Sequence, residues 1–237
     1  MDLLFQDDAY LKSCDAEVIS VGEDGIRLSR TVFYPTGGGQ PGDSGVLKLE
    51  SGDEIRITEA RKGDSLGDVV HIVAEDDILP AVGDKVHAVL DWDRRYRHMR
   101  FHTCMHVLCS LIDGDVTGGN LAADKARLDF NLPDGPPDKI ELSEKLNAVI
   151  AENHKIGTRW ITDEDLDANP GLVRTMSVQP PRGAGRIRLL EIEDVDVQPC
   201  GGTHVKSTAE IGQVVISKIE NKGKQNRRFI VRFAEDL

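Results

Sequence analysis

The 237-residue sequence predicts an α+β protein, in which a small β-barrel-like domain precedes an α+β domain with an antiparallel sheet. Two observations carry this prediction. The first part of the chain alternates apolar and polar residues over many short stretches, which is typical of a small barrel or sandwich. Near Asp91 the alternation gives way to apolar residues spaced three and four apart, which is typical of a helix. We therefore expect one domain at residues 1–92 and a second at residues 93–237.

The strands of the first domain are predicted where the alternating stretches are bounded by turn residues. Groups such as Ser51-Gly52-Asp53 and Gly83-Asp84 supply the turns. The expected strands are 16–20, 25–29, 45–50, 54–59, 69–73 and 85–90.

The second domain is predicted to mix helices and strands. Apolar residues and histidines recur at helical steps from Met99 to Ile112, so we expect a helix over 94–112. A second helix is expected over 142–150, where Leu142 and Leu146 share a face and Asp138 can cap the start. The expected strands are 126–132, 187–192, 213–219 and 229–233.

The composition is that of a globular protein. Hydrophobic residues make up 39% and charged residues 30% of the sequence, a balance that is not typical of disordered chains. There is no run of about 18 apolar residues, so we expect neither a membrane span nor a membrane partner. The acidic N-terminus lacks a signal-peptide pattern, and we expect a cytoplasmic protein whose four cysteines stay reduced.

The formal net charge of −12 argues, taken alone, against a nucleic-acid partner. Basic residues nevertheless gather at 94–100, 182–188 and 218–228. Each cluster is either a solvated face or a local contact for phosphates. The third cluster contains the candidate phosphate contacts Lys222, Lys224, Arg227 and Arg228.

Two pairs of metal-binding residues stand far apart in the sequence. His102 and His106 are four apart on the expected helix, so both imidazoles lie on one face. Cys200 and His204 are four apart around two glycines, which allow the backbone angles of a tight loop around an ion. Together they form a nitrogen and sulfur donor set typical of zinc. Thr103 follows His102, so the glutamate of the H-E-x-x-H metalloprotease pattern is missing.

The segment from Tyr34 to Gly42 reads Tyr-Pro-Thr-Gly-Gly-Gly-Gln-Pro-Gly. Three consecutive glycines add nothing to a core and cost backbone entropy. One interpretation is a flexible turn. The other is a loop whose backbone approaches a small ligand closely, because glycine has no side chain in the way.

These motifs together resemble a known family. His102-Thr-Cys-Met-His106 and Cys200-Gly-Gly-Thr-His204 resemble the HxxxH and CxxxH motifs of the alanyl-tRNA synthetase editing domain. Residues 33–45 resemble the glycine-rich motif of that family, and residues 216–228 resemble the segment that closes the domain. The chain is most similar to AlaX, the free-standing trans-editing proteins, in the form with the glycine-rich N-terminal domain and no C-terminal extension. Threonyl-tRNA synthetases carry a similar quartet, but the glycine-rich motif favours the alanyl branch.

The resemblance implies an aminoacyl-tRNA deacylase that hydrolyses mischarged tRNA(Ala), chiefly the seryl ester and secondly the glycyl ester. A pocket built for alanine rejects a substrate with one extra hydroxyl only about a hundredfold. An editing pocket whose polar groups require that hydroxyl discriminates roughly 10⁴-fold. The implied cofactor is about one zinc ion per chain, held by His102, His106, Cys200 and His204.

The resemblance also assigns roles around the glycine-rich segment. Thr36 and Gln40 are the candidate catalytic residues: Thr36 pairs with the serine hydroxyl, and Gln40 pairs with the same ligand or holds the loop. Gly37, Gly38 and Gly39 are expected to bind the substrate with their backbone. The alternative for Thr36 is a turn residue whose hydroxyl bonds its own backbone.

Under the same resemblance, Lys222, Lys224, Arg227 and Arg228 are expected to bind tRNA. Two other functions stay open. A zinc-stapled RNA-binding module without catalysis has no use for the glycine-rich loop, and another zinc-dependent esterase or amidase needs no basic surface. The sequence also leaves open whether zinc supplies the attacking hydroxide or only holds the aminoacyl group. The preference between seryl and glycyl esters and the oligomeric state are open as well.

Overall fold

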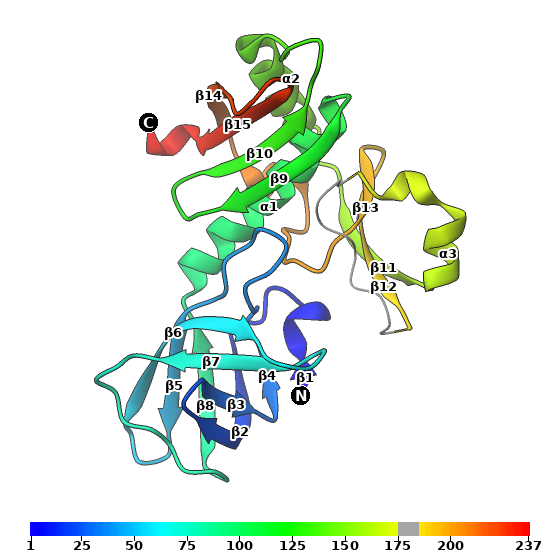
Figure 1. Ribbon diagram of the computed structural model, residues 1–237. Helices are drawn as coiled ribbons and strands as arrows, with labels where there is room; N and C mark the ends of the chain where they lie inside the picture. The colour runs from blue at the N-terminus through cyan, green and yellow to red at the C-terminus, as the bar shows by residue number, and fades with distance from the viewer. Residues whose placement is uncertain (175–184) are drawn as a thin grey trace. The chain divides into compact units, whose positions relative to one another are not determined.

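The computed structural model describes residues 1–174 and 185–237 (Figure 1). Within these ranges the chain forms two compact units, Met1–Arg97 and His98–Leu237. Strands and helices are both present and every sheet of more than two strands is antiparallel, so the predicted α+β class is confirmed. No helix in the described ranges is both long and apolar enough to cross a membrane.

The first unit is built on a closed antiparallel barrel, which confirms the predicted barrel-like domain. Closure removes the unpaired edges that an open sheet presents. Each predicted segment corresponds to one barrel strand; in barrel order these are β2 (Ser13–Gly22), β3 (Gly25–Leu28), β7 (Val69–Val73), β6 (Glu54–Lys62), β5 (Gly45–Leu49) and β8 (Lys85–Leu90). The short strands β1 (Asp2–Leu3) and β4 (Arg30–Thr31) pair in parallel, and a 3₁₀ turn, η1 (Leu4–Gln6), follows β1.

The barrel core consists of the inward members of the alternating pattern. Val18, Ile26, Leu47 and Ile55 are all fully buried in it. Because successive side chains of a strand point to opposite faces, the alternation in the sequence marks the inner and outer surfaces of the barrel.

Helix α1 (Trp92–Leu111) corresponds to the helix predicted over 94–112, and its residues from His98 onward belong to the second unit. Phe101 stacks on Phe233 with ring centroids 3.8 Å apart. The Arg100 guanidinium donates to the carbonyl of Ile211. These contacts fix the position of the helix within the second unit, and therefore of the histidines that it carries.

One sheet of the second unit has four strands, in the order β14 (Val214–Asn221), β15 (Asn226–Phe233), β10 (Ala126–Asn131) and β9 (Asp115–Leu121). Helix α2 (Lys139–Ala151) packs on β14, where the Asn147 side chain bonds both backbone groups of Val214. Asp138 caps α2 by accepting from the amides of Ile140 and Glu141, as predicted. The buried face of α2 is formed by Leu142, Leu146 and Ile150.

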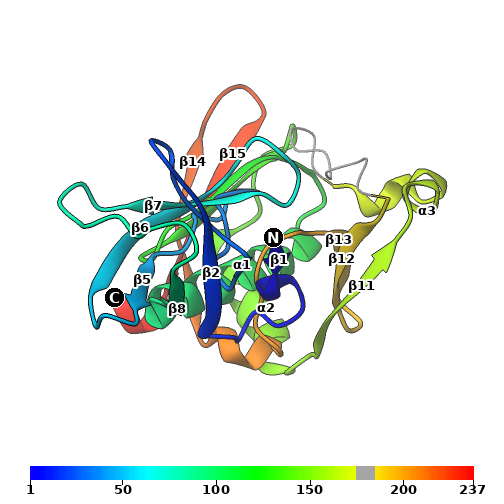
Figure 2. The ribbon, with the colours of Figure 1, turned by 90° about the horizontal axis from the view of Figure 1, so that it is seen from below.

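The other sheet has three strands, β11 (Ile156–Ile161), β12 (Ile187–Ile192) and β13 (Asp196–Pro199). Both views show α3 (Asp163–Ala168) beside it (Figures 1 and 2). The sequence did not predict β9, β11 or β13. The four middle residues of β11 are exposed, so β11 shows no alternation. The remaining 3₁₀ turns are η2 (Pro170–Leu172), η3 (Thr208–Ile211) and η4 (Ala234–Asp236).

A buried histidine lies in the barrel wall. His71 on β7 is inaccessible to solvent, and its two ring nitrogens lie 3.0 Å from the Ile26 carbonyl and 2.8 Å from the Thr31 hydroxyl. The amide of Phe33 donates to the same hydroxyl. The Nδ1 proton therefore goes to the carbonyl, and Nε2 accepts from Thr31. Burial lowers the pKa of His71 to about 4, so the ring is neutral in the folded state.

We expect this histidine to make the fold acid-sensitive. The folded-state pKa of His71 lies below the unfolded value of about 6.5. The stability that depends on a neutral His71 is therefore fully present above pH 6.5 and is lost as the pH falls toward 4. His71→Gln should reduce this pH-dependent loss of unfolding free energy by about 3 kcal/mol, measured by denaturant titration at pH 7.5 and pH 4. His87→Gln, which alters a half-exposed histidine of the same barrel, is the matched control. Equal pH dependence in the two variants would contradict the assignment.

Candidate metal centre

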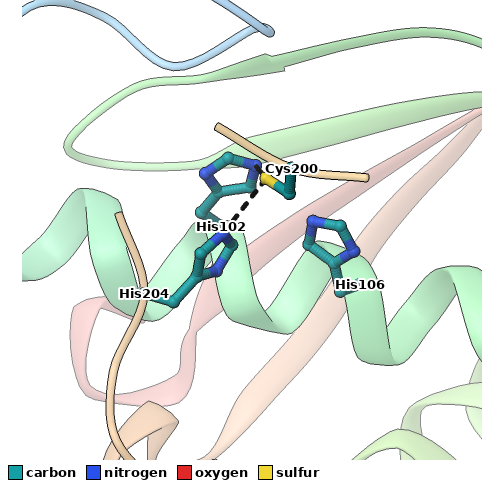
Figure 3. Close-up of side chains that lie close together, drawn as sticks. All are labelled: His102, His106, Cys200 and His204. Atoms are coloured by element: carbon teal, nitrogen blue, oxygen red, sulfur yellow. Dashed lines mark hydrogen bonds between the residues drawn. The ribbon is translucent and has the colours of Figure 1, made fainter. Parts of the chain in front are cut away.

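The structure brings together the four residues that the sequence singled out. His102 and His106 lie one turn apart on α1, while Cys200 follows β13 directly and His204 lies in the loop after it (Figure 3). One donor atom from each residue can be chosen so that all four lie within 4.8 Å of one another. Residues nearly a hundred positions apart therefore meet in one cluster.

The loop that carries Cys200 is held to β12. The Cys200 amide donates to the Arg188 carbonyl over 3.0 Å. The guanidinium of the same arginine donates to the carbonyls of Cys200 and Gly202 over 3.1 and 2.8 Å. Neither Gly201 nor Gly202 adopts a positive φ, so the expectation that glycine supplies special backbone angles here is wrong. The loop is shaped instead by its hydrogen bonds to Arg188.

Two of the distances between donor atoms match those around one tetrahedral ion. Metal–nitrogen bonds of about 2.0 Å and metal–sulfur bonds of about 2.3 Å place neighbouring ligand atoms about 3.3–3.6 Å apart. In the structure the Cys200 sulfur lies 3.5 Å from Nε2 of His102 and 3.2 Å from Nε2 of His204. Cys200, His102 and His204 are therefore spaced as ligands of one ion would be.

The electrostatics of the cluster favour a cation. Burial raises the pKa of the Cys200 thiol, but the three surrounding imidazoles outweigh burial and lower it well below its usual value. Burial lowers the pKa of His204 to about 3. For His106, burial lowers the pKa, but the Cys200 thiolate and the Asp196 carboxylate raise it to about 9. A thiolate and a neutral imidazole are the forms that bind metals, and the thiolate stabilises a positive charge beside it.

A threonine fixes the ring of His204. The Thr103 hydroxyl donates to the Met99 carbonyl over 3.0 Å, so its lone pairs accept from Nδ1 of His204 at 3.2 Å and from the Val205 amide at 3.3 Å. His204 thus carries its proton on Nδ1 and turns the Nε2 lone pair toward the Cys200 sulfur. A thiolate facing a lone pair has no proton between the two atoms, and a shared metal ion satisfies both.

A carboxylate faces the ring of His106. Oδ2 of Asp196 lies 3.5 Å from Nδ1 of His106, which makes no hydrogen bond to any residue that the structure describes. The amide of Gln198 donates to both Asp196 oxygens, over 3.0 and 2.8 Å, and holds the carboxylate in place. A carboxylate at one ring nitrogen orients a histidine so that the other nitrogen can bind a metal. The donor set, its spacing and these partners show that the cluster can bind a metal ion.

The other predicted site residues lie in the first unit, in a turn before β5. Gly37 and Gln40 exchange two backbone hydrogen bonds of 3.0 Å. Gly38 and Gly39 between them have φ angles of 58° and 81°, the pattern of a type I′ turn, which favours glycine at both positions. Gln40 is buried, which favours its role in holding the loop, whereas Thr36 is exposed.

The first two basic clusters are largely structural. Arg95 is fully buried and paired with Asp43, just after the glycine-rich segment, so it cannot contact phosphate. Arg188 is buried at the metal loop, and the Arg186 guanidinium lies 4.2 Å from the centre of the Trp160 ring. Arg182 lies outside the described residues.

The third cluster surrounds the turn between β14 and β15. Arg228 donates twice to Asp129 over 2.8 Å, and Lys222 pairs with Glu220. Arg227 donates to backbone carbonyls of the turn, and Lys224 is exposed at its tip. The positive charge of this cluster is therefore partly neutralised.

Sequence reasoning missed the residues that orient the metal ligands. Thr103 and Gln198 are common residue types with no distinguishing spacing. Asp196 follows Glu193 and Asp194 in the sequence, and nothing in the pattern separates it from them. Asp196 is distinguished from them only by its 3.5 Å contact with His106 in the folded chain.

Two protein-family models match parts of the chain. Residues 187–230, which include Cys200 and His204, match the family described as the second additional domain of threonyl and alanyl tRNA synthetases. Residues 7–94 match the class II (A) tRNA synthetases.

Similarity to individual proteins extends over almost the whole chain. The alanyl-tRNA editing protein AlaX-M of Methanosarcina acetivorans is 38% identical in an alignment that covers 96% of this chain and 96% of that protein. AlaX-M of Saccharolobus solfataricus is 35% identical, over 95% of each chain. The alanine–tRNA ligase of Pyrococcus furiosus is 37% identical over 92% of this chain but only 24% of the ligase. The chain therefore belongs to the AlaX family of alanyl-tRNA editing proteins.

The contact between Asp196 and His106 leads to a test of the metal centre. Asp196→Ala removes the carboxylate that orients the imidazole, so affinity for Zn²⁺ should fall roughly 10–100-fold in a competition titration with a chelating dye. Glu193→Ala, which removes an exposed carboxylate nearby in the same turn, should keep full affinity. If both variants bind Zn²⁺ equally well, Asp196 does not orient His106.

Proposed function

We propose that this chain hydrolyses the ester that joins a wrong amino acid to tRNA(Ala), chiefly serine and secondly glycine, with the help of one zinc ion. The observation that carries the proposal is the cluster of His102, His106, Cys200 and His204. It occurs in a chain whose relatives of similar length are named alanyl-tRNA editing proteins.

The donor set favours zinc among the common divalent metals. Three imidazoles and one thiolate suit a borderline-soft ion with tetrahedral preference, whereas magnesium and calcium prefer oxygen ligands. A zinc ion supplies Lewis acidity to an ester and to the water that attacks it. Thr103 and Asp196 hold two of the imidazoles in the orientation that binding requires.

The reaction needs no other co-reactant than water. The water oxygen bonds to the acyl carbon, and the bond between that carbon and the ribose oxygen breaks. The ribose oxygen takes up a proton, which leaves a free amino acid and an uncharged tRNA. The buried position of His102 and His204 limits competing water near this site.

We propose that the first unit supplies the recognition of the amino acid. Thr36 is exposed, and its hydroxyl can pair with the hydroxyl of serine. The turn leaves open space at Gly38, because a Cβ atom there would meet no atom of the described residues within 4 Å apart from its two chain neighbours. Alanine offers no hydroxyl and leaves the polar group without its partner.

The central test is deacylation of seryl-tRNA(Ala) by the purified chain, followed as release of free serine. We expect hydrolysis by the wild type and about one zinc per chain. Cys200→Ala and His106→Ala should lose both the metal and the activity, and Cys14→Ser should retain both. Binding of tRNA without release of serine would indicate an RNA-binding module. Hydrolysis of simple esters but not of seryl-tRNA would indicate another zinc esterase.

The third basic cluster gives a second test, on tRNA binding. Replacing Lys224 and Arg227 by glutamine should weaken binding and reduce the slope of log affinity against log salt by about 1 for each phosphate that the variant no longer neutralises. Lys48→Gln, which removes a half-exposed charge on the barrel, is the control. An unchanged slope would show that the cluster is a solvated face. Arg228 is left intact because Asp129, which is buried, would lose one of its two arginine partners.

A further inference from the structure

The hydrogen bonds of Thr36 leave only one kind of interaction open to a ligand. A hydroxyl has one proton to donate and two lone pairs. The Thr36 hydroxyl oxygen lies 2.6 Å from Oε1 of Glu59, and the Gly42 amide donates to it over 2.7 Å. A carboxylate can only accept, so the Thr36 proton goes to Glu59 and the Gly42 amide occupies one lone pair. Among the described residues nothing occupies the other lone pair of Thr36, which stays free.

The position of Glu59 depends on an irregularity in β6. Ile55 and Ile57 point into the barrel, and strict alternation would turn Glu59 inward as well. The pairing of β6 with β7 shifts register between Ile57 and Glu59, so the next inward residue is Ala60. This β-bulge keeps Glu59 on the outer surface.

The glycine-rich segment is fastened to the same stretch of β6. The Thr36 amide donates to the Ala60 carbonyl over 2.9 Å. A Cβ atom at Gly42 would lie 1.9 Å from that carbonyl oxygen, so only glycine fits there. The backbone of the segment is thereby held independently of Glu59, whose hydrogen bond acts on the Thr36 hydroxyl alone.

A second residue orients the carboxylate. Nε of Arg61 donates to Oε2 of Glu59 over 2.7 Å, which leaves Oε1 for Thr36. The hydrogen bond from Thr36 is the largest of the interactions that lower the pKa of Glu59, and the interactions with Arg61 lower it further. The carboxylate is therefore charged at neutral pH. Arg61, Glu59 and Thr36 thus form a chain of hydrogen bonds with a fixed direction.

We propose that Glu59 is a positioning residue that determines specificity: it holds the Thr36 proton, so that Thr36 accepts a hydrogen bond from the ligand and cannot donate one. The proposal rests on the proposed function. It predicts that the site selects for a side chain that donates a hydrogen bond, as serine does, and against an acceptor of the same size. The negative charge of Glu59 also polarises the Thr36 oxygen and makes it a better acceptor.

An amide in place of the carboxylate reverses this direction. In Glu59→Gln, Arg61 still requires an acceptor, so the amide oxygen faces Arg61 and the amide nitrogen faces Thr36. Thr36 then accepts from Gly42 and from the new amide, so no lone pair is left for the ligand, and its own proton goes to the Ala60 carbonyl, 3.5 Å away, or to the ligand. The variant keeps the shape of the side chain.

The test compares serine with 3-fluoroalanine, which is nearly the same size but has no proton to donate. Each is attached to tRNA(Ala), and the hydrolysis rates are measured. We expect wild type to prefer serine, and Glu59→Gln to reduce that preference roughly 2–12-fold. Thr36→Val should reduce it similarly, and the double variant should lose no more than either single variant. Glu54→Gln removes a charge from the same strand, where Glu54 pairs with Lys48, and should match wild type.

Several outcomes would overturn the proposal. An unchanged preference in Glu59→Gln means that Glu59 does not set the direction of the Thr36 hydrogen bond. Equal losses of hydrolysis rate on both substrates mean that Glu59 only stabilises the loop. A preference that Thr36→Val leaves intact means that Thr36 does not read the ligand. If wild type fails to hydrolyse seryl-tRNA, the proposed function fails. In that case the dissociation constants of the 3′-seryl and 3′-fluoroalanyl amides of 3′-amino-3′-deoxyadenosine give the same ratio without catalysis.

Discussion

The second unit is organised around one electrostatic constraint, a thiolate and three imidazoles that lie within 4.8 Å of one another, with His102 and His204 buried. Desolvated donors of this kind are costly to hold together unless a cation stands among them. Two of the four donors are brought together by their spacing in the sequence, since His102 and His106 share one face of α1. The other half depends on tertiary structure, because Arg188 holds the Cys200 loop to β12 and Phe233 holds α1 in place. A metal ion would therefore meet donors that are already arranged, so that little entropy would be lost in ordering them.

In both units a neighbouring residue decides which atom of a functional side chain is free. Thr103 takes the Nδ1 proton of His204 and leaves Nε2 for a metal, and Asp196 faces Nδ1 of His106 in the same way. Glu59 takes the Thr36 proton and leaves a lone pair. These partners add little binding energy of their own. They fix the direction of a hydrogen bond or the tautomer of a ring, and such choices separate similar substrates and metals.

The sequence predicted what depends on spacing and missed what depends on pairing. Each barrel strand appeared as a run of alternating residues, and the metal quartet appeared as two pairs with a spacing of four. Arg95 and Arg188 were grouped with surface charges, although both are buried and hold backbone or a carboxylate. Local pattern cannot distinguish a solvated arginine from one that meets Asp43 across 52 positions. The sequence also could not predict the exposed edge strand β11 or the orientation of Glu59, since both follow from strand register.

The free energy of a single hydrogen bond limits how far one hydroxyl can discriminate between seryl and alanyl esters. A single neutral hydrogen bond contributes about 0.5–1.5 kcal/mol, or roughly 2–12-fold in rate. Discrimination near 10⁴-fold needs several times more, and it arises where a polar group is desolvated and left without a partner. An unpaired group costs about 1–3 kcal/mol if neutral and more if charged. Thr36 is bonded to the charged Glu59, so burying its free lone pair beneath an alanyl group would desolvate part of a carboxylate as well. Under the proposed function, serine would satisfy that lone pair and remove the penalty. On this proposal, the Glu59 carboxylate that bonds Thr36 would raise the free-energy cost of binding alanine more than it would strengthen the binding of serine.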